Sequence, residues 1–222
     1  MNKFFNIWTL IFTILTIPFV FAVGWNIDFS FFGLNVPGEE FEYADLSFNI
    51  SAGIIFTLGV LKASKKWAGI NITRQKKRFV FLSNISRSRL KRVILYNILE
   101  MSFHLIFAFF FIVVMETAVF VGLVFVLLFL ENLINTLFGV LKQTYSIGIT
   151  SKAIIFVDRD VKAIYFKGLK KISKHQQTIY FEYVNDLVLH VPTNLIPQEK
   201  EDEFLETLQR IVDPNKVFYT GF

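Results

Sequence analysis

The chain has 222 residues, of which 54% are apolar, 28 are phenylalanine and 18% are charged. A soluble domain of this size usually carries about 25% charged residues, so the composition favours a membrane protein. The sequence contains no cysteine, which excludes disulfides, thiolate metal sites and cysteine nucleophiles within it, and its net charge of +5 comes in separate blocks.

The first apolar stretch is residues 4–24, FFNIWTLIFTILTIPFVFAVG. A bilayer core about 30 Å thick needs ~20 apolar residues per helix, so this stretch is long enough to span it. A cleaved signal peptide is the alternative, because Ala22, Val23 and Gly24 resemble a cleavage site, but its apolar core usually has only ~7–15 residues. We therefore predict an uncleaved first span, kinked at Pro18.

The following segments differ sharply in charge. Residues 25–46 carry five acidic and no basic residues, whereas residues 62–92 carry eleven basic and no acidic residues. Lys and Arg in short loops stay on the cytoplasmic side, so we predict the acidic loop outside, the basic segment inside, and a second span at about 47–64. Both termini are then cytoplasmic, and the expected location is a bacterial inner membrane. The acidic loop is either a plain interfacial loop or a patch that captures a cation or a basic partner.

Three roles are open for the basic segment. Within residues 74–93 the apolar residues fall near helical spacing, which predicts a helix lying on an anionic membrane surface. The charges could instead serve topology alone, or bind nucleic acid, which we do not expect because no nucleic-acid motif is present. The cations assigned here to contact with anionic lipid or a partner are Lys76, Lys77, Arg78, Arg87, Arg89, Lys91 and Arg92.

Residues 94–140 are long enough for two more spans, at about 95–115 and 118–140, with a turn near Glu116–Thr117 or at Gly122. With the first two spans they predict an all-α four-helix transmembrane bundle over residues 1–141. A turn near residue 116 would gather several polar side chains in the inner third of the membrane. These are Glu100, His104, Glu131, Asn132 and Asn135.

This polar cluster has competing interpretations. Ionisable groups inside a membrane are costly and count as functional candidates, so a proton or ion relay is one interpretation. The favoured one is interhelical hydrogen bonding that fixes helix register, worth ~1 kcal/mol per bond. A third places Glu131 at the interface because the fourth span ends early. Glu100 and His104 supply only two ligands, so no metal site is predicted.

Residues 142–222 change character and predict a cytoplasmic α+β domain. Residues 199–212 have one apolar face, an acidic first turn and Arg210 in the last turn, which predicts a helix. We expect a mainly antiparallel sheet or small barrel closed by this helix. Short alternating apolar runs predict its strands at 146–150, 153–158, 161–168, 178–184 and 186–191.

The run from Tyr145 to Ile211 resembles bacterial pleckstrin-homology-like domains, and most closely those of the YcxB-like group of small membrane proteins. The matching features are a strand pair turning at Ser151-Lys152, a strand running into residues 168–172, and Ile196-Pro197 before the helix. The resemblance covers about residues 145–212 and implies a seven-stranded fold. Either residues 169–177 hold a further strand or one sheet is incomplete.

These observations predict a non-enzymatic integral membrane protein whose cytoplasmic domain binds anionic lipid or a protein partner, alone or as an accessory subunit of a membrane complex. The alternative is a small transporter that uses the intramembrane Glu and His residues. The sequence shows no phosphate loop, dinucleotide fingerprint, zinc signature or catalytic triad, so we predict no cofactor and no catalytic residue. The expected partners are the lipid bilayer and another protein or a second copy. A second cationic cluster assigned to head groups or a partner comprises Lys167, Lys170, Lys171 and Lys174.

Overall fold

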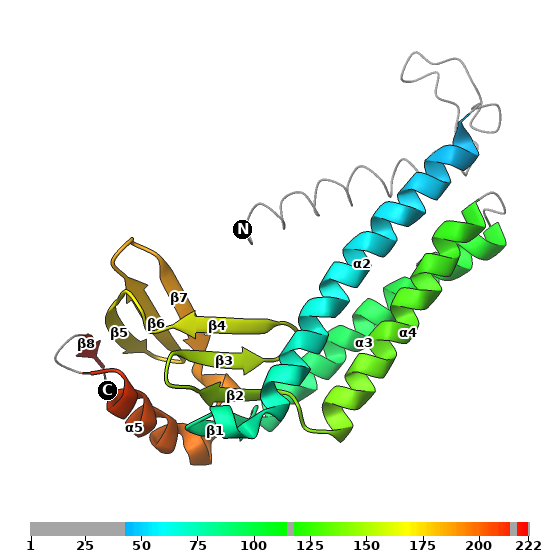
Figure 1. Cartoon of the computed structure of the whole chain (residues 1–222). Coiled ribbons are helices and arrows are strands. Elements are labelled where there is room, and N and C mark those ends of the chain that lie inside the picture. Colours follow the sequence, from blue (N-terminus) through cyan, green and yellow to red (C-terminus); the bar gives the residue numbers. More distant parts are fainter. Residues whose placement is uncertain (1–42, 115–117, 214–216, 222) are drawn as a thin grey trace. The chain divides into compact units, whose positions relative to one another are not determined.

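The computed structural model describes residues 43–114, 118–213 and 217–221 (Figure 1). The predicted first span at 4–24 and the acidic loop up to residue 42 lie outside these residues. The structure combines long helices with an antiparallel-rich sheet region, so a helical part joined to an α+β part is confirmed.

Three helices are long and apolar enough to cross a membrane, at Asp45–Arg74, Arg87–Val113 and Val119–Leu141 in the described part of the chain. They correspond to α2 (Ala44–Arg74), to α3 (Arg87–Phe109) with the π-helical turn η4 (Phe110–Val114), and to α4 (Val119–Leu141). These agree with three of the four predicted spans.

The turn between the last two spans was predicted at one of two places. Helix α4 runs without interruption through Gly122, so a turn at that residue is wrong. Apolar residues on both sides of Gly122 continue the helix. Because glycine has no side chain, α4 can pack closely against α3 at this position. The other predicted place, Glu116–Thr117, lies outside the described residues.

Helix α2 extends ten residues beyond the predicted end of the second span at residue 64. Lysine and alanine favour helix, and long lysine stems can lie along apolar surface, so the basic residues after 61 do not stop it. At its end the Thr73 hydroxyl bonds back to the carbonyl oxygens of Gly69 and Ile70, at 3.2 and 3.0 Å.

The chain divides into two compact units. Among the described residues, the first unit comprises 43–63, 99–114 and 118–133, and the second comprises 64–98, 134–213 and 217–221. Each of α2, α3 and α4 has residues in both units. The boundary between the two units therefore lies within these three helices rather than at a linker.

The first unit is held by apolar packing of helix segments. Phe48, Phe111 and Phe125 are buried, and the rings of Phe111 and Phe125 stack with centroids 5.9 Å apart. A Cβ at Gly122 would lie 3.2 Å from the Ala108 carbonyl oxygen, so glycine allows α3 and α4 to approach closely. Many large apolar side chains face outward, among them Phe103, which is 59% exposed. A continuous apolar exterior of this kind fits a bilayer or partner helices.

The second unit contains two four-stranded sheets (Figure 1). The first has the order β1-β2-β3-β4 and is fully antiparallel. Its strands are β1 (Phe81–Asn84), β2 (Ser146–Ile149), β3 (Ala153–Val157) and β4 (Val161–Tyr165).

The second sheet has the order β7-β6-β5-β8, in which β8 runs parallel to β5. Its strands are β5 (Leu169–His175), β6 (Thr178–Tyr183), β7 (Val188–Pro192) and β8 (Phe218–Thr220). The predicted strands are thus confirmed, and residues 169–177 do hold a further strand. The sequence pattern did not predict this strand, β5, because lysines interrupt the alternation of its apolar residues.

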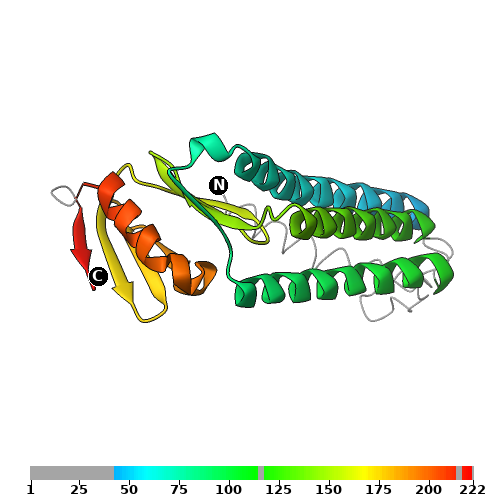
Figure 2. The same ribbon diagram turned by 90° about the horizontal axis from the view of Figure 1, so that it is seen from below.

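Helix α5 (Glu201–Ile211) closes the unit, as the acidic first turn and apolar face predict. Phe204 and Leu208 on that face are fully buried in a core with Ile147, Ile172 and Phe181 from both sheets. Figure 2 shows α5 lying across the strands. Two short 3₁₀ turns, η6 (Thr193–Leu195) and η7 (Gln198–Lys200), lead from β7 into the helix.

The predicted surface helix within 74–93 is wrong. After α2 the chain makes the 3₁₀ turn η3 (Lys76–Arg78), then forms β1, and α3 begins only at Arg87. Phe81 pairs with Ile149 and Asn84 with Ser146, so β2 satisfies the β1 backbone. This long-range pairing overrides the local helical spacing. The first sheet therefore takes one strand from outside residues 142–222.

Candidate functional site

A polar cavity of about 660 Å³ lies in the second unit, where two apolar helices end. The end of α2, the end of α4, β1 and the start of β2 each contribute to its wall. The described residues that line it are Thr73, Arg74, Lys76, Leu82, Ser83, Asn84, Lys142, Gln143, Thr144 and Ser146.

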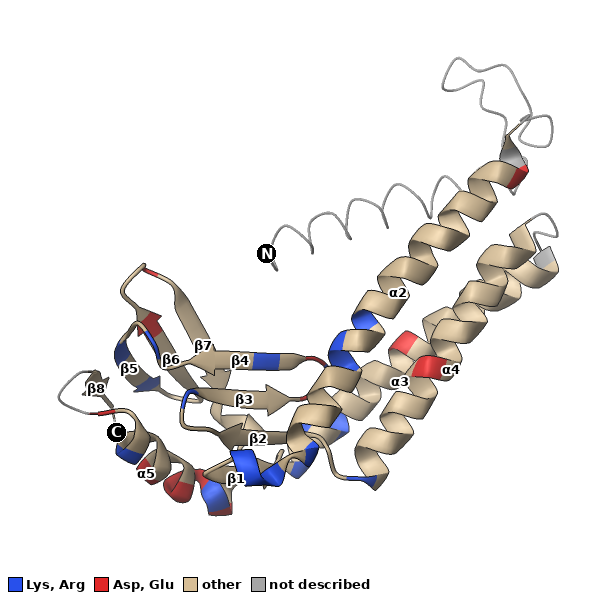
Figure 3. Cartoon of the chain, viewed as in Figure 1, with Lys and Arg blue, Asp and Glu red and all other residues tan. Residues whose placement is uncertain are grey.

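The cavity is positively charged. Arg74, Lys76 and Lys142 line it, and none of its described lining residues is acidic. None of these three cations forms an ion pair within the described part of the chain. The C-terminal ends of α2 and α4 each add about half a negative charge, which three full positive charges outweigh. Figure 3 shows Lys and Arg concentrated beside β1, in the same region.

Hydroxyl and amide groups complete the lining. The Ser146 hydroxyl donates to the Thr144 carbonyl oxygen at 3.3 Å, and the Asn84 amide donates to Gln143 Oε1 at 3.0 Å. Thr144 Oγ1 is buried and has no hydrogen-bond partner among the described residues. Buried polar groups are almost always partnered, so this hydroxyl is available to a ligand. The hydroxyls of Thr73, Ser83 and Ser146 already donate to backbone carbonyl oxygens, so the three cations and the Thr144 hydroxyl are the groups that can hold a phosphate or another oxyanion.

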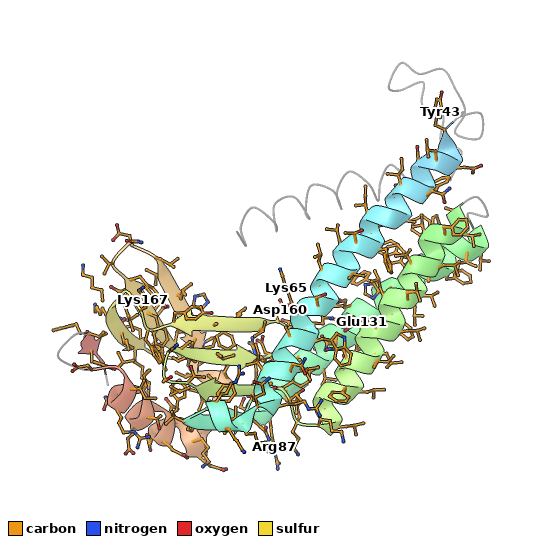
Figure 4. All side chains as sticks on the ribbon, in the orientation of Figure 1. Tyr43, Lys65, Arg87, Glu131, Asp160 and Lys167 are labelled. Carbon is orange, nitrogen blue, oxygen red and sulfur yellow. The ribbon has the colours of Figure 1, made fainter. Side chains whose placement is uncertain are left out.

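The predicted cations of the first basic segment separate into different roles. Lys76 lines the cavity, whereas Lys77 and Arg78 lie exposed in η3. Arg87, labelled in Figure 4, begins α3 and is exposed. Lys91 and Arg92 are also exposed, on the first turns of α3.

Arg89 is occupied by an internal ion pair. Its guanidinium donates to the carboxylate of Asp158, whose side chain is only 4% exposed. Burial raises the pKa of Asp158, but the Arg89 hydrogen bond, the Arg159 backbone N–H and the charges of Arg89 and Lys162 together lower it below its ordinary value. Asp158 therefore stays ionised, and Arg89 fastens the start of α3 to the turn after β3.

The second predicted cationic cluster lies on or beside β5. Lys171 pairs with Glu182 at 3.8 Å and Lys174 pairs with Glu201 at 2.7 Å. Lys167, labelled in Figure 4, lies in the turn before β5, and Lys170 is exposed at its start. Two of the four cations are thus paired with carboxylates.

The predicted polar cluster of the helices is divided between the two units. In the first unit, Glu100 forms an ion pair with Lys62 at 2.7 Å, and the His104 ring lies 6.1 Å from that of Phe125. Glu131, labelled in Figure 4, and Asn132 lie on α4 in the same unit, whereas Asn135 belongs to the second unit. The sequence analysis missed Lys62 as a partner. Its place at the inner end of one span, opposite a glutamate near the inner end of the next, could have indicated it.

A hydrogen-bonded group in the second unit was also missed. The Asn97 amide donates to Thr136 Oγ1 at 2.9 Å and to the Tyr145 hydroxyl at 3.4 Å. Burial raises the pKa of Tyr145 more than its hydrogen bonds with Thr136 and Asn97 lower it, so the phenol stays neutral. These contacts tie α3 and α4 to the chain entering β2.

Comparison of the chain with protein-family models, with curated proteins and with solved structures finds no match. The resemblance of residues 145–212 to pleckstrin-homology-like domains therefore stays a prediction. Among the described residues no group of three or more His, Cys, Asp or Glu side chains could hold a metal ion.

Proposed function

We propose that this chain is a non-enzymatic integral membrane protein that binds an anionic lipid head group in the basic cavity at the ends of α2 and α4. The observation that carries the proposal is the lining itself. Arg74, Lys76 and Lys142 line one cavity together with the unpartnered Thr144 hydroxyl, and none of the described lining residues is acidic.

The position of the cavity along the helices supports a lipid as the source of the anion. Lys142 follows the last residue of α4, a helix that is apolar enough to cross a membrane, and Arg74 from the longer helix α2 lines the same cavity. The end of a membrane-spanning helix lies at head-group depth, where basic pockets between helices bind anionic head groups. The bias of Lys and Arg assigns this end to the cytoplasmic side of a bacterial inner membrane, with both termini inside.

The pleckstrin-like resemblance is part of the proposal for the second unit. It implied a seven-stranded fold over residues 145–212, where the unit has six strands, β2 to β7, and the closing helix α5. The unit would hold the cavity in a fixed geometry, either alone or as an accessory subunit whose apolar helices pack against partner helices.

Ion transport is not part of the proposal. Glu100, one of the residues predicted for a relay, forms an ion pair with Lys62 at 2.7 Å. An ion pair of this kind stabilises the packing of helices.

The test is lipid binding by the purified full-length protein in a neutral detergent. Native mass spectrometry compares phosphatidylglycerol with phosphatidylcholine of the same acyl chains. We expect a preference for phosphatidylglycerol of at least tenfold, falling to less than threefold in a variant with Arg74→Gln, Lys76→Gln and Lys142→Gln.

A matched control removes the same number of charges from the same region. The control variant carries Lys77→Gln, Arg78→Gln and Lys91→Gln, which are exposed and outside the described cavity lining. It should keep most of the preference. An equal loss in both variants would mean that diffuse surface charge, rather than the cavity, attracts the lipid.

A further inference from the structure

A second cavity, of about 370 Å³, adjoins the basic one. It differs in chemistry, because Ile85, Leu90 and Val140 supply apolar surface and Arg87 is its charged residue among those described. Its other described lining residues are Asn84, Gly139, Gln143 and Tyr145. We refer to it as the apolar cleft.

The two cavities meet at one pair of residues. Asn84 and Gln143 line both, and the Asn84 amide donates to Gln143 Oε1 at 3.0 Å. This bond leaves the Gln143 amide N–H groups to donate to a ligand oxygen at the junction. Gln143 has a φ of 50°, a left-handed conformation in the turn from α4 toward β2, and it lines both cavities.

We infer that the basic cavity and the apolar cleft together form one site for a single anionic glycerophospholipid. The phosphate lies among Arg74, Lys76 and Lys142, the glycerol and ester oxygens lie at Asn84 and Gln143, and one acyl chain enters the cleft. This inference rests on the proposed function and adds to it a requirement for the acyl chain.

Continuity and size support this occupant. A charged cavity that opens beside an apolar one matches the two ends of a phospholipid, whereas a free phosphate or soluble anion would leave the cleft unused. Both volumes fall in the range of about 300–1,000 Å³ typical of small-ligand sites.

The experiment compares two probes on the full-length protein in neutral detergent. Phosphatidylglycerol carries head group and acyl chains, and glycerol 3-phosphate carries the phosphate and glycerol alone. We expect phosphatidylglycerol to bind at least tenfold more tightly than glycerol 3-phosphate, with phosphatidylcholine as the measure of non-specific acyl partitioning into the detergent.

A variant that fills the cleft isolates the contribution of the chain. Val140→Trp should reduce the advantage of phosphatidylglycerol to less than threefold and leave glycerol 3-phosphate affinity within twofold of the original. Leu141→Trp is the matched control. Leu141 is the next residue in the chain, its side chain is 76% exposed, and it is absent from the described lining of the cleft. It should retain the full advantage. Val140→Phe fills less of the cleft and replaces Val140→Trp if the melting temperature shows that the larger side chain prevents folding.

The outcomes separate the two proposals. If the original protein binds glycerol 3-phosphate as tightly as phosphatidylglycerol, or if Val140→Trp and Leu141→Trp keep the same advantage, the acyl-chain inference is overturned while the basic cavity stands. If neither probe binds better than phosphatidylcholine, the proposed function itself fails.

Discussion

Two stretches of this chain look alike in the sequence and differ in the structure. Residues 62–92 and 167–174 are both rich in lysine, and both were predicted to contact anionic head groups. In the first, Arg74 and Lys76 line a cavity of about 660 Å³ in which the described lining contains no acid. In the second, Lys171 and Lys174 on β5 pair with Glu182 and Glu201.

The difference lies in what each stretch packs against. The first stretch joins two apolar helices and adds strand β1, so its cations gather where helix ends meet the sheet. The second is a strand within a sheet, where β6 and α5 bring carboxylates within reach. A count of basic residues therefore predicts positive charge, and the neighbouring elements decide whether that charge stays open to a ligand.

The largest effect on unfolding free energy is expected for Arg89, the cation of the first stretch that forms an ion pair with a buried carboxylate. Asp158→Asn removes the partner of Arg89, and breaking a buried ion pair costs about 3 kcal/mol of unfolding free energy. Guanidinium unfolding in detergent, followed by the circular dichroism of the sheet, measures it. If Asp158→Asn unfolds like the original protein, the pair does not fasten α3 to the sheet.

The same pair predicts a pH dependence with a definite sign. The pKa of Asp158 is lowered in the folded state, so its contribution to stability is present above its ordinary unfolded value of about 4. That contribution is lost as the pH falls through the lowered pKa. The stability of the Asp158→Asn variant should lack this component of the acid-induced loss.

The next effect concerns the first cation of the same stretch. Lys62→Met removes the ion pair with Glu100, whose side chain is only 15% exposed. Because Lys62 is itself about half exposed, we expect a cost of about 1–2 kcal/mol, between the values for surface and buried pairs. The double variant Lys62→Met with Glu100→Gln should recover most of it in thermal unfolding. No recovery would show that Lys62 matters for something other than this pair.

A direct comparison of the two stretches uses lipid binding. Replacing Arg74 and Lys76 by Gln should weaken phosphatidylglycerol binding about tenfold, equivalent to about 1.4 kcal/mol. Replacing Lys167 and Lys170 by Gln removes the same charge and should change binding by less than twofold. A larger effect at Lys167 and Lys170 would reverse the assignment and make β5 the lipid-contacting surface.

The smallest effect is expected for the paired cations of β5. Lys174→Met removes an ion pair with Glu201 in which both side chains are about one-quarter exposed. Partly exposed pairs contribute little, so we expect about 0.5 kcal/mol in chemical unfolding. Lys170→Met, at an exposed and unpaired position in the described structure, is the control and should leave stability unchanged. Equal effects would show that the Glu201 pair contributes nothing.

Much of the fold was predictable because its signals are local. A run of about 20 apolar residues predicts a long apolar helix from local sequence, which is why three predicted spans each coincide with such a helix, although α2 ends ten residues later and α3 begins eight residues earlier than predicted. Alternation of apolar residues likewise predicted β2, β3, β4, β6 and β7, and the apolar face with an acidic first turn predicted α5.

The candidate site was predictable only in part. Lys76 was assigned to anionic contact, but Arg74 and Lys142 were not, since neither stood out from its neighbours in sequence. Arg89 was assigned to a ligand, whereas its partner Asp158 lies 69 residues away. No local pattern distinguishes a cation that faces a cavity from one that faces a buried carboxylate.

Sequence alone thus determined the long apolar helices, most of the strands and the closing helix, because each depends on side chains within a few residues of one another. Tertiary structure decided the rest. Strand β1 exists because Phe81 pairs with Ile149, and the basic cavity exists because the ends of α2 and α4 meet β1 and β2. Both require contacts between segments more than 60 residues apart, and no local sequence pattern predicts such contacts.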